Sequence, residues 1–566
     1  MVPIPWSAVF LVAGHLTTLG TAQDVIQPSE VPTADEFMQK NWVSSFIVGN
    51  YLYMDGGYLN RSVAGNYTYG TVKETLSLDL SKSWAPRDVQ MRQIPKDAPT
   101  NPRQAYFVDA SSGTVYGWGG LYGKDFAPHQ TFVGKLSAHS DGGGSWSTES
   151  ESESDHKGLA GLYRSHGGAA ASTPESGFYF GGLSEDTTQA SGDWSSGYFQ
   201  FDFKSQQRTW TNHTNSPYSP SGTLFAASAH YVPSLGPNGL IMIMGGNERD
   251  AGSGEGSDLS METLWFLDPV THEWYSQRTS GVAPPRRRWP CTVGAASPNG
   301  TYEIFVFGGN NNKMAFDDVY IMSLPGFVWQ KVNTSPKNGT ARSFMSCVLA
   351  GQRQMIVVGG SDQQKNPRGR DPFPQGLGVF DVTDLQWKDE YDAAAAQYDS
   401  PEVIKSWYSA GNIDRVSYDP KVEALLQTAP RTNDRGSSSN AEQSNAEQSR
   451  LTTGAIAGIS IGGVLLVVLI GVAALLLRRR RNRRGGGAPV PDVGSHKESP
   501  YSPRELSTAT EISELPIKQP GTELQGHDPR YFAAELDTSE TFQDPRKYPA
   551  GFDRSPPSFG SQNQSA

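Results

Sequence analysis

No set of side chains in this sequence has the spacing that a catalytic or metal-binding site requires. Its histidines between residues 129 and 272 are scattered and show no paired spacing for a metal ion. They are His129, His139, His156, His166, His213, His230 and His272. The sequence lacks a Gly-X-Ser-X-Gly elbow, a phosphate-binding loop and the helical motif of zinc proteases. Carboxylates are plentiful, but spacing marks none as a catalytic pair. We therefore predict no catalytic residue, no metal and no cofactor.

Four arginines are the candidate binding residues. Each lies shortly before a hydrophobic, strand-like run, and they are Arg103, Arg164, Arg286 and Arg342. Arginine forms bidentate hydrogen bonds with carboxylates, so a group of arginines would suit an acidic or carboxylated partner. The alternative is that these side chains bond structurally to backbone carbonyl groups of neighbouring repeats.

The cysteine content excludes a disulfide-stapled scaffold and a cysteine-ligated metal cluster, because only Cys291 and Cys347 occur. Each lies five residues after an arginine, Arg286 or Arg342, which suggests equivalent positions in adjacent repeats. We expect free buried thiols. A disulfide is the alternative, if neighbouring strands bring the Cα atoms to about 5.5 Å.

Between residues 40 and 392 the chain repeats itself six times. Six hydrophobic runs end in Gly-Gly, and their final glycines, 51 to 64 residues apart, are Gly57, Gly120, Gly182, Gly246, Gly309 and Gly360. Each run precedes a second strand-like stretch and then a tryptophan: Trp84, Trp146, Trp210, Trp274, Trp329 or Trp387. Two independent markers with one period predict a repeat architecture.

The repeat predicts four-stranded blades arranged in a ring. β-Branched and aromatic runs favour strands, and Gly-Gly permits a turn that residues with a Cβ resist. We expect the tryptophan to fill the space between neighbouring blades. One blade cannot bury both of its faces, so a closed ring supplies the core and protects the sheet edges.

These features resemble the kelch repeat. They are the Gly-Gly run, then a strand such as Tyr198-Phe-Gln-Phe-Asp202 or Leu264-Trp-Phe-Leu-Asp268, then Trp210 or Trp274. The resemblance implies an all-β, six-bladed kelch-type β-propeller. A seventh, degenerate blade in residues 393–430 is an open alternative. In such a propeller the four arginines would ring the mouth of the central channel. Tyr122 and Phe126, in a long loop, would stack on sugars or simply pack the loop.

Kelch propellers are related to that of galactose oxidase, a copper enzyme. That family binds copper through two histidines and two tyrosines, one of them cross-linked to a cysteine. The scattered histidines and the repeat-like positions of Cys291 and Cys347 do not reproduce this pattern. A galactose-oxidase-like carbohydrate enzyme is therefore the least favoured hypothesis, and we predict that the protein is not an enzyme.

Two apolar segments predict membrane targeting. Residues 1–22 have the apolar stretch of a signal peptide, with Gly20 and Ala22 before the cleavage point; a core strand or helix is the alternative. Residues 453–477 carry no charge and are long enough to cross a bilayer as a helix. The basic run Arg478–Arg484 follows and should stay cytoplasmic. We predict a single-pass type I membrane protein with its N-terminal part outside.

One face of the predicted membrane helix carries Gly454, Gly458 and Gly462, four residues apart. This spacing lets two helices approach closely, which would give a homodimer; ordinary glycine content explains it equally well.

The predicted outside part, 23–430, contains acceptor sequences for N-glycosylation, which we expect in loops. They lie at Asn60, Asn66, Asn212, Asn299, Asn333 and Asn338. Residues 431–452 are rich in Ser, Asn and Gln and read as a stalk. Residues 478–566 read as a disordered cytoplasmic tail, with candidate phosphorylation sites at Ser499, Ser502 and Ser555.

The overall order of segments, including Ser400 to Tyr408 before the membrane helix, resembles fungal kelch-repeat membrane proteins. The resemblance implies the plasma membrane, with the endosome or vacuole as alternatives. The net charge of −11 and the lack of a basic face on the repeats argue against nucleic acid. We expect a non-enzymatic surface receptor or adhesion-like protein that binds a protein or wall polysaccharide outside and cytoplasmic proteins through its tail. The alternative is a cell-polarity scaffold acting through the tail.

Overall fold

The computed structural model describes residues 31–428, apart from 97–100, 122–132, 150–151, 153, 163, 185–192, 215, 220, 250–255, 334–339 and 363–368. The chain through Asp434 forms one compact unit and the remainder forms another. The predicted signal peptide, stalk, membrane helix with its three glycines, and tail with its three serines all lie outside the described residues. Within them, no helix combines the length and apolar character needed to cross a bilayer. Tyr122, Phe126 and Asn338 also lie outside.

Strands form almost all of the regular structure, mostly as antiparallel sheets. Six sheets share one pattern, in which four strands pair with one another in the order in which they occur along the chain, and we number these sheets one to six. Sheets one to three contain β2 (Ser44–Val48), β3 (Tyr51–Asp55), β6 (Thr75–Asp79) and β7 (Arg92–Ile94); β8 (Ala105–Asp109), β9 (Thr114–Trp118), β10 (Gly134–Ala138) and β11 (Gly144–Thr148); and β13 (Ala169–Ser172), β14 (Ser176–Phe180), β17 (Tyr198–Asp202) and β18 (Thr209–His213).

Sheets four and five each gain a short extra strand, β21 (Gly256–Asp258) and β24 (Ser280–Gly281). The main strands of sheets four to six are β19 (Phe225–Val232), β20 (Leu240–Arg249), β22 (Thr263–Leu267) and β23 (Trp274–Arg278); β25 (Cys291–Ala296), β26 (Tyr302–Phe307), β27 (Val319–Leu324) and β28 (Val328–Lys331); and β29 (Ser343–Ala350), β30 (Gln354–Ser361), β31 (Leu377–Asp381) and β32 (Gln386–Lys388).

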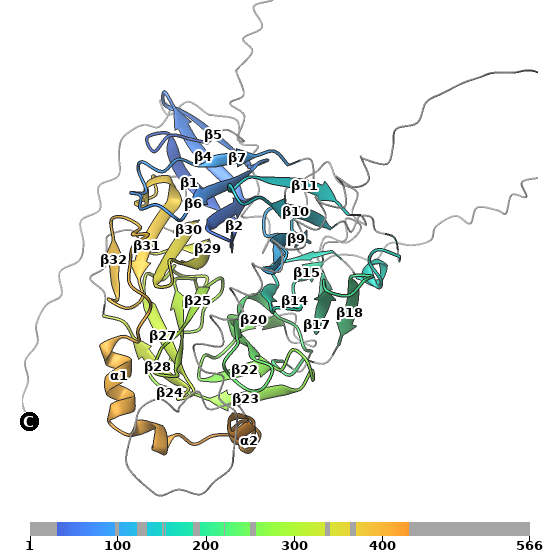
Figure 1. The fold of residues 1–566 in the computed structure, drawn as a ribbon, viewed down its shortest axis with the longest axis vertical. Coiled ribbons are helices and arrows are strands. Elements are labelled where there is room, and N and C mark those ends of the chain that lie inside the picture. The colour runs from blue at the N-terminus through green and yellow to red at the C-terminus, as the bar shows by residue number, and fades with distance from the viewer. Residues whose placement is uncertain are drawn as a thin grey trace, which may run out of the picture. The chain divides into compact units, whose positions relative to one another are not determined.

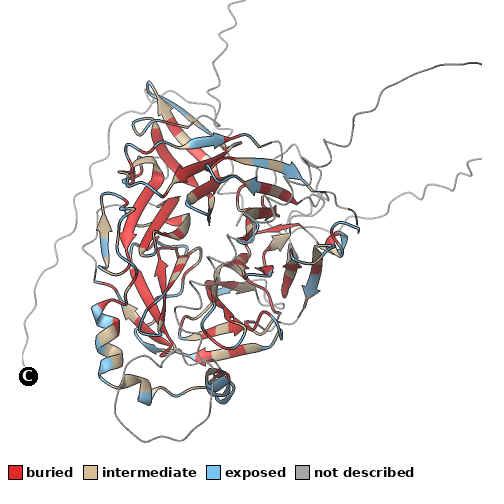
Figure 2. Cartoon of the chain, in the orientation of Figure 1, coloured by how far each residue is buried: buried red, intermediate tan, exposed pale blue. Residues whose placement is uncertain are grey.

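The first strands of the six sheets form a closed circuit around a central axis (Figure 1). Each contacts the next in the order β2, β8, β13, β19, β25 and β29, and β29 contacts β2. The second strands are buried along nearly their whole length, as Figure 2 shows for most of the sheets. The architecture is all-β, with few helices, and is consistent with a β-propeller. Because the circuit and its core lie within one compact unit, we expect residues 23–434 to fold independently.

The Gly-Gly pairs connect each sheet to the next. Both glycines of all six pairs have positive φ angles, between 63° and 98°. In sheet four the amide of Gly246 donates to the carbonyl of Arg287, at the entry to sheet five, over 2.8 Å. A Cβ on Gly245 would lie 2.7 Å from that same oxygen. Glycine is therefore favoured at both positions for two reasons: the backbone is left-handed, and the neighbouring segment of chain approaches too closely to leave room for a Cβ.

The six predicted tryptophans pack between sheets, as expected. Trp146 donates its indole N–H to Thr75 of sheet one over 2.8 Å, and Trp329, 1% exposed, donates to Met261 beside sheet four over 2.9 Å. The others make ring contacts with aromatic residues of the preceding repeat: Trp210 with Phe107, Trp274 with Phe180, Trp387 with Phe307, and Trp84 with Tyr391.

The circuit closes without exchanging a strand between the chain ends. β1 (Phe37–Asn41) pairs with β4 (Tyr58–Val63), which pairs with β5 (Asn66–Thr71), and this small sheet contacts β30. The amide of Asp371 donates to the carbonyl of Met38 over 2.7 Å. Trp84 and Tyr391 exchange two backbone hydrogen bonds. Sheets one and six are thus joined by flanking segments.

Further short elements lie outside the main strands. β12 (Ser165–His166), β15 (Leu183–Ser184) and β16 (Asp193–Trp194) form another small sheet. The short 3-10 helices are η1 (Leu159–Gly161), η2 (Pro374–Gly376) and η3 (Asn412–Arg415).

The seventh blade considered for residues 393–430 does not form in the described part of that segment. Residues 393–428 instead contain α1 (Glu402–Ser409), η3 and α2 (Pro420–Thr428), with no strand (Figure 1). We call residues 393–428 the C-terminal strap. Ile404 of the strap is buried with the core beside sheets five and six, and Val422 and Leu425 are buried with the core of sheets four and five.

Candidate ligand-binding site at the channel mouth

One residue at the entry to each first strand has a left-handed backbone. We call these the mouth residues: Trp42, Arg103, Gly167, Ala226, Trp289 and Phe344, with φ between 54° and 71°. Five of the six are not glycine, and positive φ is a genuine outlier for bulky side chains. Such residues persist where the surroundings hold them in place, and they gather at ligand-binding and active sites.

Backbone hydrogen bonds explain this conformation. The amide of Trp42 donates to the carbonyl of Phe344 over 2.8 Å, which joins sheets one and six. The amides of Ala226 and Trp289 donate to the mouth residue of the preceding sheet, each over 2.7 Å. These backbone groups of the mouth residues therefore form hydrogen bonds with a neighbouring sheet and not with the adjacent strand of their own sheet. In β19, for example, the register of pairing with β20 passes over Ala226. The strain is offset by inter-sheet bonds.

The side chains of the mouth residues form an aromatic cluster that carries one arginine. The ring of Trp42 lies 3.9 Å from that of Phe344 and 4.6 Å from that of Trp289. The guanidinium carbon of Arg103 lies 3.4 Å from the centre of the Trp42 ring. Phe225 extends the cluster, 5.2 Å from Trp289. All five side chains are half-buried. We call Trp42, Arg103, Phe225, Trp289 and Phe344 the mouth cluster.

Strand direction places the mouth cluster and the strap at opposite ends of the strands. The mouth residues precede the first strands, and the second strands run back to end at the Gly-Gly pairs, next to the mouth. The strap instead contacts the far ends: Leu425 lies against Gly236, in the turn between β19 and β20. Tyr408 accepts a hydrogen bond from the amide of Gly326, in the turn between β27 and β28. The mouth face is therefore free of the strap.

Only one of the four predicted binding arginines belongs to the mouth cluster, namely Arg103. Arg342, 1% exposed, forms a bidentate ion pair with Asp371 and donates to the carbonyl of Gly359. Arg164 is also buried. Arg286 is exposed and donates to the backbone carbonyl of Asp258. Arg286 thus bonds to a backbone carbonyl of the neighbouring repeat, whereas the partners of Arg342 lie in its own repeat.

The prediction that Arg286 and Arg342 occupy equivalent positions in adjacent repeats was wrong by one residue. Arg287 is the counterpart of Arg342: it pairs with Asp318 over 2.6 Å and donates to the carbonyl of Gly308 over 3.0 Å. Each lies two residues before a mouth residue. The prediction rested on the equal spacing of each arginine from a cysteine, and the two cysteines do not occupy equivalent positions themselves.

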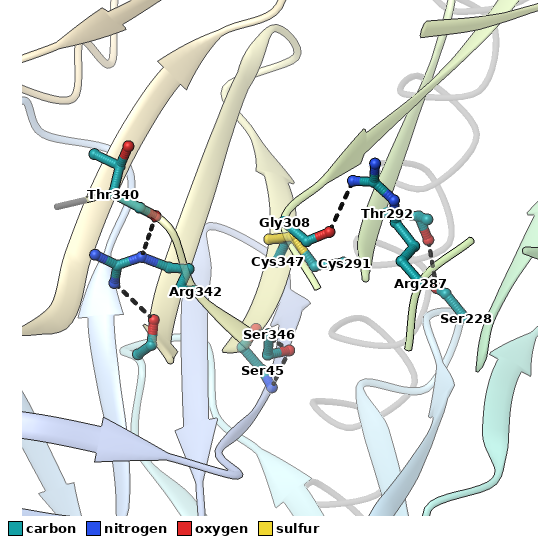
Figure 3. The surroundings of a disulfide bond; sticks show 11 residues. Ser45, Ser228, Arg287, Cys291, Thr292, Gly308, Thr340, Arg342, Ser346 and Cys347 are labelled. Carbon is teal, nitrogen blue, oxygen red and sulfur yellow. Dashed lines mark hydrogen bonds between the residues drawn. A yellow bond between two sulfur atoms is a disulfide. The ribbon is translucent and has the colours of Figure 1, made fainter. Parts of the chain in front are cut away.

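Cys291 and Cys347 form a disulfide, so the expectation of free thiols was wrong (Figure 3). The bond joins β25 to β29, with Cα atoms 5.7 Å apart. Cys291 pairs with Phe307 and Cys347 with Val357, whereas the counterpart of Phe307 in sheet six is Val358. This offset of one residue places the two side chains on opposite faces of their own sheets, and hence facing each other between sheets.

Hydroxyl pairs occupy the same location at other sheet boundaries. Ser228 bonds to Thr292 between sheets four and five, and Ser45 to Ser346 between sheets one and six, each over 2.7 Å. In every case one partner lies two residues and the other three residues after its mouth residue. The disulfide is therefore a covalent version of a repeated contact between first strands (Figure 3).

The described histidines and carboxylates do not assemble into a metal site: among these residues no group of three or more potential ligands lies close enough together. His156 accepts a hydrogen bond from the indole of Trp210 over 3.0 Å, and burial lowers its pKa to about 4. His230 bonds to the hydroxyl of Tyr302, and burial likewise lowers its pKa to about 4. These contacts suit neutral, structural histidines.

The predicted glycosylation sites within the described residues lie at the surface, although not all in loops. Asn66, Asn212, Asn299 and Asn333 are exposed, and Asn60 is half-buried. Asn60, Asn66 and Asn212 lie on strands β4, β5 and β18. The short acceptor motif carries no information about strand pairing, which explains the difference.

The chain is similar to a protein described as "Kelch repeat-containing protein" from Arthroderma benhamiae, with 26% identity over 403 residues. The alignment covers 62% of this chain and 57% of that relative, so the chain spans little more than half of its length. No family model matches the chain. The similarity supports the kelch-repeat family and agrees with the six Gly-Gly sheets.

Proposed function

We propose that the chain is a non-enzymatic, six-bladed kelch propeller that binds a protein or polysaccharide ligand at the mouth cluster. In this proposal a membrane helix anchors the propeller at the cell surface, and the tail docks cytoplasmic proteins. The relative named for kelch repeats supports a binding propeller.

The mouth cluster is the observation that carries the proposal. Tryptophan and arginine are the residues that most often dominate binding energy at interfaces, because they offer a large rigid surface together with charge. Trp42 and Arg103 are stacked on each other, and Trp289 and Phe344 hold Trp42 in place. The pre-ordered backbone reduces the entropy lost on binding. Arg103 would favour a carboxylated ligand.

Two features support a surface location. The Cys291–Cys347 disulfide is typical of an oxidising compartment. Four of the glycosylation asparagines are exposed.

The test is retention of residues 23–434, produced with glycans, on isolated wall polysaccharides and on purified surface proteins. Saturable retention should fall at least tenfold in the double variant Trp42→Ala/Trp289→Ala, since loss of a central aromatic residue costs about 2 kcal/mol or more. Val270→Ala, at an exposed apolar residue outside the mouth, is the matched control. Equal retention by the mouth variant would contradict the proposal, and no retention at all would favour the polarity scaffold acting through the tail.

A further inference from the structure

The outer face of the small β1-β4-β5 sheet carries three tyrosines. Tyr67 and Tyr69 of β5 are 67% and 61% exposed, which is unusual for large aromatic side chains. The ring of Tyr58, on β4, stacks on that of Tyr69, with the ring centres 5.2 Å apart and the ring planes 12° apart. Tyr58 pairs with Thr71, and residues two apart on a strand share a face, so all three tyrosines lie on one side of the sheet. We call Tyr58, Tyr67 and Tyr69 the tyrosine face.

Asn60 lies at the centre of the tyrosine face and belongs to an Asn-Arg-Ser acceptor sequence for glycosylation. It follows Tyr58 by two residues on β4 and pairs directly with Tyr69 of β5. Directly paired residues of antiparallel strands point to the same face, with Cβ atoms about 4.5–5.5 Å apart. A sugar joined to the side-chain amide of Asn60 would therefore lie beside the ring of Tyr69.

The surroundings of Asn60 leave one direction open to a glycan. On the β1 side, Asn60 pairs with Gln39. That side is covered, because Gln39 is only 3% exposed and its amide donates to the carbonyl of Gly369 over 2.8 Å. The β5 side is open, because Tyr67 and Tyr69 are exposed there. A glycan on Asn60 is thus directed over β5.

We propose that Asn60 carries an N-linked glycan whose first sugar, N-acetylglucosamine, packs on the ring of Tyr69. The C–H groups of a pyranose ring carry partial positive charge and pack favourably on the negative face of an aromatic ring. Tyr58 supports one face of the Tyr69 ring, and the sugar covers the other. The glycan also shields β5, the outer strand of its sheet, from pairing with another chain. This proposal rests on the surface location proposed above, because N-glycosylation belongs to secreted domains.

Asn66 provides a matched control in the same pair of strands. It belongs to a second acceptor sequence, Asn-Tyr-Thr, and is exposed. Side chains alternate between the two faces of a strand, so Asn66 points to the face opposite Tyr67 and Tyr69. A glycan on Asn66 should therefore not cover the tyrosine face.

The experiment uses residues 23–434 produced with glycans, with the occupancy of each asparagine measured by mass spectrometry. Hydroxyl-radical footprinting then compares Tyr69 in wild type, Asn60→Gln and Asn66→Gln. Asn60→Gln should raise the oxidation rate of Tyr69 about twofold or more, because a sugar covers one of the two faces of an aromatic ring. Asn66→Gln should leave this rate unchanged.

A reciprocal measurement follows the glycan. Under native conditions an endoglycosidase should remove the glycan of Asn60 faster from Tyr69→Ala than from wild type, because the sugar has lost the ring on which it packs. Tyr69→Phe keeps the ring and should be cleaved at the wild-type rate. Cleavage at Asn212, on β18, should be the same in all three proteins, which controls for the fold.

Three results would overturn the proposal: an unmodified Asn60 in a protein that is glycosylated at Asn212, equal oxidation of Tyr69 in wild type and Asn60→Gln, or equal cleavage in wild type and Tyr69→Ala. A protein without glycans at any acceptor would contradict the surface location as well. Retention of ligands at the mouth is measured separately, so failure of this proposal and failure of the proposed function are distinguishable.

Discussion

Glu303 is a fully buried carboxyl group that ties the strap to sheet five. It accepts hydrogen bonds from Ser323 over 2.9 Å, from Tyr398 over 2.8 Å and from Ser400 over 3.1 Å. Burial nevertheless outweighs these donors and raises the pKa of Glu303 above its ordinary value of 4.5. The charged form is therefore less favourable in the folded protein than in the unfolded chain.

Glu303→Gln should remove a pH-dependent loss of stability. Because the folded-state pKa is raised, wild-type stability from this group is complete below pH 4.5 and declines as the pH rises through the folded pKa. Each unit of raised pKa corresponds to about 1.4 kcal/mol. Urea unfolding between pH 4 and 8 should show wild type losing stability relative to Glu303→Gln as the pH rises. A constant difference across this range would show that Glu303 does not titrate as described.

At the residue scale, the sequence predicted that arginines precede the first strands, but it did not predict which of these residues lie at the mouth. Arg103 could be assigned to the mouth because it precedes a strand-like run. Its partner Trp42 could not, since its left-handed backbone depends on a hydrogen bond to Phe344, about 300 residues away. Arg287 was missed because Arg286, Arg287 and Arg288 are adjacent, and only the inward direction of one side chain distinguishes them.

At the scale of the elements, the contact between neighbouring first strands is made by different residue types at different sheet boundaries. Cysteines occupy it between sheets five and six, and hydroxyl pairs occupy it at two other boundaries. A disulfide closing a loop of this length, with the cysteines 56 positions apart in the sequence, stabilises by about 4 kcal/mol in the chain-entropy description.

Two double variants should separate the covalent bond from the contact itself. Cys291→Ala/Cys347→Ala should lower the free energy of unfolding by about 2–4 kcal/mol. Cys291→Ser/Cys347→Thr copies the Ser228–Thr292 pair and should regain about 1 kcal/mol through a hydrogen bond. Urea titration under non-reducing conditions measures both. If the hydroxyl variant were no more stable than the alanine variant, the two contacts would not be interchangeable.

The strap is the second element with a testable role. Its Ile404, Val422 and Leu425 are buried against sheets four to six. Ending the folded unit at residue 397 should therefore cost on the order of 5 kcal/mol and expose apolar surface. Thermal unfolding and dye binding of residues 23–397 and 23–434 measure this. Equal melting temperatures would mean that the strap is only a linker.

Elements were the scale at which sequence reasoning succeeded. The Gly-Gly pairs and tryptophans depend on local chemistry, namely backbone freedom and side-chain size, and both lie where the repeat predicted. The strap was ambiguous because its short apolar stretches fit a degenerate blade as well as a helix. The helical conformation is selected by packing against the far ends of sheets four and five. The local sequence of the strap does not reveal this packing.

For the whole molecule, the central claim is that ligands meet the propeller at its mouth. Length, composition and repeat spacing predicted an all-β ring, and the closed circuit of first strands agrees. The nature of the mouth could not be predicted, since it is assembled from residues of sheets one, two, four, five and six that are distant in the sequence.

Hydroxyl-radical footprinting of residues 23–434, free and saturated with the retained ligand, tests this claim most directly. The account predicts that Trp42, Trp289 and Phe344 are oxidised in the free protein and protected in the complex. Exposed Tyr67 and Tyr69 on β5 should react equally in both. Unchanged oxidation of the mouth aromatics, with protection elsewhere, would contradict the account and move the binding site away from the channel mouth.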